Sequence, residues 1–363
     1  MLNGHSIIIV HGHDRSMCSL LRRHAYVLAS ATGMTGQFRI IPSYECVRDE
    51  YVLAHTAAVV LGRVQGPESA AFTQYYGRIK RKYGFQVIVD YDDCLWQPQP
   101  SYNRCPHDHV AVGGHIDSVL QYIDLVTVST EFLAIQWRAR FGMSVPVRIL
   151  PNMLPRSLYG QRGHFINKGL AGPKVVYGGS PTHYCKGDPG DFAGPWIEWL
   201  NRGVEEDKFE LHMFGYREKF ECEFLERVKD KIVLHDPVPA CMWGQALRDT
   251  FGDIYIAPLR ENDFNRAKSD LKLLEAGASG MALMSSVWHD FAPYNRAHPD
   301  SQVGPEYTAK DLDGMLEKLC EPETYNAVQM HQNRILAHRW TEQSDNLTTV
   351  LKTWAGKYIE VPR

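Results

Sequence analysis

The sequence lacks the features that mark a membrane protein, an exported protein or a general polyanion binder. No stretch approaches the run of about 18 apolar residues that a spanning helix needs. The opening MLNGHSIIIVHGHD has no basic stretch and only a short apolar run, so we expect no signal peptide. The formal net charge of −3 gives no general attraction to nucleic acid. It is an average over the whole surface, so it is compatible with a local basic groove.

Cysteine pairs and metal-ligand clusters are also missing. The 8 cysteines lie far apart and none forms a C-x-x-C motif, which is typical of reduced thiols in an intracellular protein. We therefore expect a cytoplasmic location. The histidine pairs His11/His13 and His107/His109 have no companion ligands, so we predict no metal site.

Short apolar runs alternate with helical stretches along the 363 residues. The predicted strands are HSIIIVHG, FRIIPS, TAAVVLGR, FQVIVDYD, LVTVST and VRILPN, followed by KVVYGG, FELHMFG, KIVLHD, DIYIAPL and MALMSS. The predicted helices include MCSLLRRHAYVLAS, ESAAFTQYYGRIKRKYG, GPWIEWLNRGVEE, KFECEFLERVKD, MWGQALRDTF and KSDLKLLEAGAS. Such alternation predicts βαβ units, mostly parallel sheets and an α/β fold class.

A segment rich in proline and glycine, PNMLPRSLYGQRGHFINKGLAGPK, interrupts this alternation and predicts a linker. We expect Rossmann-like, doubly wound domains over residues 1–155 and 173–340, joined by a linker over 156–172. A helical tail over 341–363 is expected to pack back on the first domain. Parallel sheets bind ligands beyond the carboxyl ends of their strands, so we predict a cleft between the two domains.

The residues after the first strand form the turn VHGHDRS. Gly12 permits a tight turn, and free amides of the next helix could meet a phosphate or a sugar. An ordinary turn, with Asp14 or Ser16 capping the helix, is the alternative.

The loop after the first strand of the second half, VVYGGSPTHYCKGD, combines small residues with hydrogen-bond donors and a charge. The glycines let a ligand approach the backbone, and a lysine suits a diphosphate. The candidate binding residues are Gly178, Gly179, Ser180, Thr182, His183 and Lys186. A plain Gly-Pro loop, with His183 packed or solvated, is the alternative.

The segment IAPLRENDFNRAKSDLKLLEAGASG predicts a strand, a polar loop and a helix that begins near Lys268 or Ser269. Glu275 lies two helical turns beyond Lys268, so both side chains can point to one side. A lysine at a helix amino end attracts phosphate, and a glutamate accepts hydrogen bonds from vicinal hydroxyls. A solvated Lys/Glu face is the alternative.

Over nearly the whole chain, these segments resemble the GT-B glycosyltransferases. VDYDDCLW, IDLVTVST, VRILPN, GGSPTH, APLRENDFNRAKSDLKLLEAGASG and the region of Trp340 are similar to, and ordered as in, the large retaining family with a degenerate E-x7-E motif. That family is glycosyltransferase family 4-like, of bacterial and phage type. The resemblance implies transfer of a sugar, with retention, from a UDP- or GDP-type nucleotide-diphosphate sugar to a hydroxyl. It implies no metal and no other cofactor.

The resemblance assigns roles to individual positions. The first domain would bind the acceptor and the second the nucleotide sugar. Glu275 matches the second glutamate of the motif, which holds the ribose, whereas Ala267 stands where the first glutamate belongs. Lys268 and Ser269 match the segment beside the diphosphate and the transferred sugar. An arginine that many members use at the phosphates is missing, and its candidate substitutes are Lys186, Lys268 and Arg266.

The acidic stretch VIVDYDDCLW contains Asp90-Tyr91-Asp92, which spells D-x-D, a metal and nucleotide motif of the other glycosyltransferase fold. In a GT-B enzyme, amides and basic residues neutralise the leaving diphosphate, so we interpret Asp90 as strand-end structure. Asp92 and Asp93 would lie on the acceptor side, where Tyr91 and Trp96 suit stacking on a sugar or a base. The catalytic candidates are Lys268, Asp92 and His183.

The acceptor is left open between a glycan and a hydroxymethylated DNA base, because the resemblance extends to phage proteins of an infected host cytoplasm. GRIKRKYG, with Arg78, Lys80, Arg81 and Lys82, is either a basic patch for DNA or a solvated helix end. Two other classes of protein also fit. One is a non-hydrolysing nucleotide-sugar epimerase of similar fold, and the other is a non-enzymatic two-domain binding protein.

Overall fold

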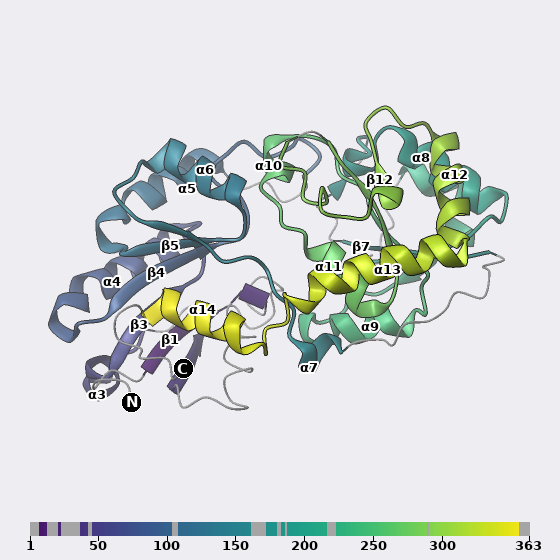
Figure 1. The fold of residues 1–363 in the computed structure, drawn as a ribbon. Coiled ribbons are helices and arrows are strands. Elements are labelled where there is room, and N and C mark those ends of the chain that lie inside the picture. The colour runs from purple at the N-terminus through teal and green to yellow at the C-terminus, as the bar shows by residue number, and fades with distance from the viewer. Residues whose placement is uncertain are drawn as a thin grey trace.

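The computed structural model describes residues 7–12, 21–22, 37–42, 46–103, 108–160, 172–179, 183–185, 187–215, 223–288 and 290–355. The chain forms two lobes, each built on a six-stranded parallel sheet (Figure 1). The strand orders are β2-β1-β3-β4-β5-β6 and β12-β11-β10-β7-β8-β9. In both sheets the order reverses next to the first strand of the lobe, which confirms the predicted doubly wound α/β architecture.

The first lobe contains strands β1 (Ile7–Gly12), β2 (Gln37–Pro42), β3 (Thr56–Leu61), β4 (Gln86–Tyr91), β5 (Leu125–Val128) and β6 (Val147–Ile149). Its helices are α3 (Glu50–Ala54), α4 (Pro67–Tyr83), α5 (His109–Asp117) and α6 (Glu131–Phe141). Every residue of β3 is buried, as expected for a parallel strand with both faces covered. α4 begins at a proline, and it ends at Gly84, whose φ of 85° suits glycine.

The second lobe contains β7 (Lys174–Gly178), β8 (Glu210–Phe214), β9 (Val233–His235), β10 (Ile254–Ala257), β11 (Ala282–Ser286) and β12 (Gln302–Val303). Its helices are α8 (Pro195–Glu205), α9 (Trp243–Asp249), α10 (Asp263–Arg266), α11 (Leu271–Ser279), α12 (Ala309–Cys320) and α13 (Pro322–Ala337). The lobe also contains the 3₁₀ segments η4 (Gly190–Phe192) and η5 (Glu223–Lys231). None of the described helices is long and apolar enough to cross a bilayer.

The connections between the lobes lie at one side. Helix α7 (Arg156–Tyr159) falls in the predicted linker, and its Tyr159 packs with Leu274 and Trp340 in a cluster to which both lobes contribute. At the other end of the chain, α13 belongs to the second lobe whereas α14 (Ser344–Ala355) lies on the first (Figure 1). Val350 and Trp354 of α14 are buried in a cluster with the strands β1, β3 and β4. The first sheet is therefore covered partly by the end of the chain.

Every predicted strand is present, but one helix boundary is wrong. α11 begins at Leu271, and the cap Asp270 follows a turn that contains Lys268 and Ser269. The separate helix α10 and the short strand β12 were not predicted, and the predicted helix KFECEFLERVKD is 3₁₀ over its described part. Most of the predicted helix MCSLLRRHAYVLAS lies outside the described residues.

Candidate functional site

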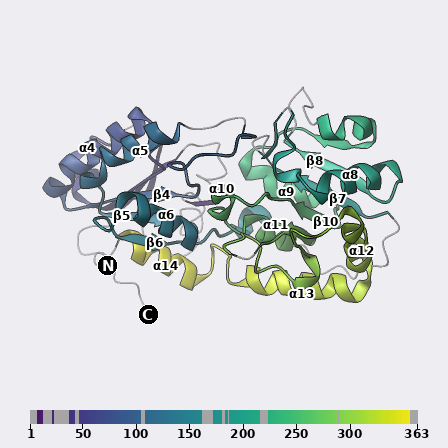
Figure 2. The same ribbon diagram turned by 90° about the horizontal axis from the view of Figure 1, so that it is seen from above.

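Residues in the loops after the strands make several of the contacts between the lobes. The hydrogen bonds are Thr130 Oγ1 to the Ala267 carbonyl oxygen (3.0 Å), Asn152 Nδ2 to Ser269 Oγ (2.6 Å) and Tyr102 Oη to Asp191 Oδ1 (2.7 Å). The rings of Phe132 and Phe291 pack at 5.2 Å between centroids. In two views α6 and α10 lie next to each other where the lobes meet (Figures 1 and 2). The carboxyl edges of the two sheets therefore face each other.

Glu275 is held inside the second lobe and is only 3% exposed. Its Oε1 accepts hydrogen bonds from Trp243 Nε1 at 2.8 Å and from Tyr159 Oη at 3.2 Å, while Oε2 accepts one from Tyr255 Oη at 3.1 Å. Burial raises the pKa of Glu275, and the charge of Lys272 together with these donors opposes that rise. The alternative that Glu275 lies on a solvated helix face is therefore wrong.

The lysine in the first turn of α11 is Lys272, which the sequence analysis missed. Its Nζ donates to the Gly178 carbonyl oxygen and lies 4.4 Å from the centroid of the Tyr177 ring. Burial lowers the pKa of Lys272 to about 8, although Glu275 opposes this shift. Its i, i+3 spacing from Glu275 was a usable signal, but the helix was predicted to begin too early, so Lys268 was chosen instead.

Lys268 lies half-buried in the turn between α10 and α11, 5.3 Å from the centroid of the Phe264 ring. Burial is the main cause of the lowered pKa of His183, and the charge of Lys268 adds to it. In the first lobe, burial and the neighbouring Asp92 raise the pKa of Asp93, whereas the charges of Arg63 and Lys268 oppose the rise. Lys268 therefore acts electrostatically on residues of both lobes.

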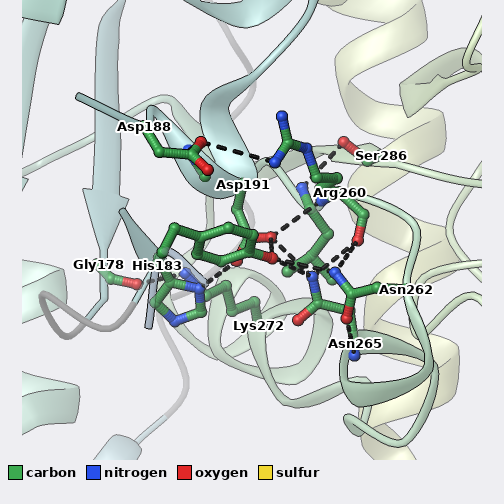
Figure 3. A network of polar contacts seen from close by, with 12 residues as sticks. Gly178, His183, Asp188, Asp191, Arg260, Asn262, Asn265, Lys272 and Ser286 are labelled. Carbon is green, nitrogen blue, oxygen red and sulfur yellow. Dashed lines mark hydrogen bonds and ion pairs between the residues drawn. The ribbon is translucent and has the colours of Figure 1, made fainter. Parts of the chain in front are cut away.

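A buried hydrogen-bond network surrounds Asp191 in η4 (Figure 3). Its Oδ2 lies 2.6 Å from Nδ1 of His183, and its Oδ1 accepts from Tyr102 Oη at 2.7 Å and from Asn265 Nδ2 at 2.7 Å. The Arg260 amide also donates to Oδ1, at 3.0 Å. Of this group, only His183 was predicted. Tyr102 belongs to the loop after β4, and nothing in the local sequence links it to Asp191.

The packing leaves little room for a side chain at Gly178, the last residue of β7, or at Gly179. A Cβ on Gly178 would come within 2.5 Å of the Trp243 ring, and one on Gly179 within 2.5 Å of Tyr177 Oη. Their predicted role was to let a ligand approach the backbone, and that role stays a prediction. Gly12 is the last residue of β1. The predicted partners Ser180, Thr182 and Lys186 lie outside the described residues.

Two further predicted donor-binding residues have partners within the protein. Arg266 pairs with Glu261 at 2.6 Å and with Asp263 at 3.3 Å. Ser269 accepts the hydrogen bond from Asn152 described above, so its side chain contributes to the contact between the lobes. Among the described residues, Lys268 and Lys272 are therefore the candidates for binding a diphosphate near the Asp191 network and the loop that follows Gly178, here called the Gly178 loop.

The acidic stretch after β4 divides into buried and half-buried parts. Asp90 is buried and pairs with Arg22, with Nη2 to Oδ1 at 2.5 Å, and Thr127 Oγ1 donates to it. Its interpretation as strand-end structure is confirmed. Asp92 and Asp93 are half-buried beside Arg63, at 3.7 Å and 3.2 Å from its Nη1.

The prediction that Tyr91 and Trp96 stack on an acceptor is wrong. Tyr91 is 0% and Trp96 3% exposed, and the two rings meet edge to face at 5.3 Å between centroids. Both also pack against Trp137 of α6. The chain after β4 turns back into the core, because burying these large rings removes much apolar surface from water.

A cavity of about 370 Å³ opens at the carboxyl ends of β8 and β9. Its lining residues are Phe214, His235, Asp236, Pro237, Val238, Pro239, Ala246, Asp249 and Thr250. Phe214 stacks on His235 at 4.2 Å and meets Trp243 edge to face at 5.1 Å. Since Trp243 donates to Glu275, one aromatic side chain links the cavity to the buried carboxylate.

Solved structures share this architecture at low sequence identity. Sucrose-phosphate synthase from Thermosynechococcus elongatus matches with a TM-score of 0.62 at 10% identity, over 95% of this chain and 97% of that one. Anabaena HepE in complex with UDP and glucose matches with a TM-score of 0.62 at 8% identity, over 97% and 100%. A mutant O-GlcNAc transferase of Thermobaculum terrenum has a TM-score of 0.52 at 11% identity, over 98% and 68%.

No family model matches the chain, and no curated protein sequence matches it either. At identities this low the comparison establishes architecture and not chemistry. The two doubly wound parallel sheets, joined at their carboxyl edges, therefore have the GT-B fold of glycosyltransferases.

Proposed function

We propose that this protein is a glycosyltransferase that takes its sugar from a nucleotide-diphosphate sugar. The observation that carries the proposal is the arrangement around α11 at the carboxyl edge of the second sheet. There, a buried glutamate and a lysine lie on one helix, between an apolar cavity and the loop after β7. The HepE structure with UDP and glucose supports it, since that protein has the same fold and binds a nucleotide.

The donor would extend from the cavity towards the Asp191 network. The base fits the cavity, whose apolar wall includes Pro237 and Val238. The ribose would come next, at Glu275, because each carboxylate oxygen can accept more than one hydrogen bond and Oε2 has one described donor. The diphosphate would then lie near Lys272 and Lys268.

The lysines supply the chemistry that sugar transfer needs. Negative charge grows on the departing diphosphate as the glycosidic bond breaks, and cations fixed beside it stabilise that charge more in the transition state than in the ground state. We propose that Lys268 and Lys272 act in this way and that no metal or other cofactor is needed. Retention of the anomeric configuration is part of the proposal and depends on the family resemblance alone.

The acceptor would approach from the first lobe, where Asp92 and Asp93 lie within the electrostatic reach of Lys268. Two lysines of the basic stretch in α4 are paired with carboxylates. Lys80 contacts Asp124, and Lys82 contacts Glu50, both at 2.7 Å. Because paired lysines attract phosphate weakly, we favour a glycan over a hydroxymethylated DNA base as the acceptor.

A panel of UDP- and GDP-sugars, incubated with and without acceptors, tests the proposal. We expect release of one nucleoside diphosphate together with an acceptor that gains the mass of the sugar. Isomerisation of the donor without an acceptor would instead show an epimerase. Binding without turnover would show a ligand-binding protein.

A further inference from the structure

The imidazole of His183 is fixed by an ionised carboxylate on one side only. Asp191 lies 2.6 Å from Nδ1 and is itself 2% exposed. Tyr102, Asn265 and the Arg260 amide all donate to the other oxygen of Asp191, so its position is set by contacts from both lobes. No described residue bonds Nε2 of His183, and the His183 side chain is 11% exposed.

The protonation of the pair follows from these contacts. Burial raises the pKa of Asp191, but the hydrogen bond from His183, the nearby positive charge and the Arg260 amide together outweigh burial, so the pKa is about 2 and the carboxylate is ionised at neutral pH. An ionised carboxylate only accepts hydrogen bonds, so Nδ1 must carry a proton. Burial, helped by the charge of Lys268, lowers the pKa of His183 to about 4, so the ring is neutral. Nε2 therefore presents a lone pair.

The lone pair on Nε2 and the nearby lysines determine which chemical group of a ligand can bind at His183. A phosphate oxygen is an acceptor and cannot bond to a lone pair, whereas a hydroxyl can donate to one. His183 follows the Gly178 loop and lies within the electrostatic reach of Lys268 and Lys272, which the proposed function places at the diphosphate. In a nucleotide sugar, the hydroxyl-bearing group joined to the diphosphate on the side away from the ribose is the transferred sugar.

We propose that Nε2 of His183 accepts a hydrogen bond from one hydroxyl of the transferred sugar, and that Asp191 and Tyr102 are positioning residues that fix the ring and its tautomer. This inference rests on the proposed function. His183 is then a specificity-determining residue and not a general base, because a group that is so weakly basic accepts a proton poorly at neutral pH. Tyr102 makes the recognition depend on the first lobe as well.

The first test uses donors in which single sugar hydroxyls are replaced by fluorine, which cannot donate. In the wild-type protein we expect kcat/KM to fall at least about tenfold when fluorine replaces the hydroxyl at one ring position, because Nε2 of His183 then has no hydrogen-bond donor. In His183→Leu that penalty should shrink to within about twofold, and penalties at the other positions should be unchanged. Equal discrimination by both proteins at every position would overturn the inference.

The second test needs no activity. Nitrogen-15 NMR of the labelled, ligand-free protein should show His183 protonated at Nδ1 and bare at Nε2. Asp191→Asn should shift part of the population to the Nε2 tautomer, because an amide can donate to Nδ1, and should raise the donor KM more than it lowers kcat. A wild-type proton on Nε2 would overturn the inference. If the wild-type protein released no diphosphate from any donor, the proposed function would fail, whatever tautomer was found.

Discussion

At the scale of single residues, the candidate site depends on two buried carboxylates, Glu275 within the second lobe and Asp191, which Tyr102 of the first lobe contacts. Glu275 was found because a family pattern points to it, and its burial agrees with a defined role. Lys272 was missed because α11 was predicted to begin too early, so Lys268 was taken as the lysine at the start of the helix. Asp191 and Tyr102 could not be found at all, since their contact joins positions 89 residues apart.

Replacing Glu275 with Gln keeps its size and one carbonyl oxygen but removes the charge. We expect the affinity for the nucleoside diphosphate of the true donor to fall about tenfold or more, because a charged acceptor contributes roughly 1.5–3 kcal/mol to a hydrogen bond. Isothermal titration calorimetry checks this. Lys310→Ala, on an exposed position of α12, is the matched control, and an unchanged affinity in Glu275→Gln would remove the ribose role.

The lowered pKa of Lys272 gives the donor site a pH dependence. The folded pKa of about 8 means that its charge is present below pH 8 and is lost as the pH rises through that value. Nucleoside diphosphate affinity should therefore fall between pH 7 and pH 9, measured by titration at fixed ionic strength. Lys272→Met should bind more weakly at pH 7 and show little change over this range. An identical slope in the variant would contradict the assignment.

At the scale of elements, the strands were predictable and the ends of short elements were not. Runs such as TAAVVL are buried on both faces, so composition alone identifies them. The start of α11 depends on whether Lys268 and Ser269 join the helix or the turn. A contact with Asn152 of the other lobe holds Ser269 in that turn, and no local pattern reveals it. Strand β12, Gln302–Val303, is too short to give a periodic signal.

Helix α14 provides a test at this scale. Trp354 is 0% exposed and packs on the first sheet, so Trp354→Ala should lower the free energy of unfolding by about 3–5 kcal/mol. Chemical denaturation followed by circular dichroism measures the change. Lys352→Ala, exposed on the same helix, should stay within about 0.5 kcal/mol. Equal effects of both substitutions would show that α14 contributes no packing.

At the scale of the whole molecule, the two-lobe plan was predictable, because alternating strands and helices with one interruption leave few other arrangements. The meeting of the two carboxyl edges follows from the same rule. The contacts that join the lobes were not predictable, because Thr130, Asn152 and Tyr102 look like ordinary polar residues in the sequence. One expectation, stacking by Tyr91 and Trp96, failed because these rings complete the core of the first lobe.

The assignment of the acceptor to the first lobe and the donor to the second can be tested with Asp93, which lies in the first lobe. Asp93→Asn should raise the acceptor KM about tenfold and leave nucleoside diphosphate affinity within about twofold, because the donor is assigned to the second lobe. Steady-state kinetics and calorimetry on one preparation separate the two quantities. A parallel loss of donor affinity would show that the lobes do not divide the substrates in this way.

The position of α14 has a consequence for anyone who divides this protein into pieces. A gene fragment that stops before the linker encodes a sheet with one face left without Leu347, Val350 and Trp354. Expressing the first lobe alone therefore requires joining the codons for α14 to those for the residues before the linker. The same geometry makes a circular permutant, in which the last helix leads into the first strand, a natural design for obtaining each half in isolation.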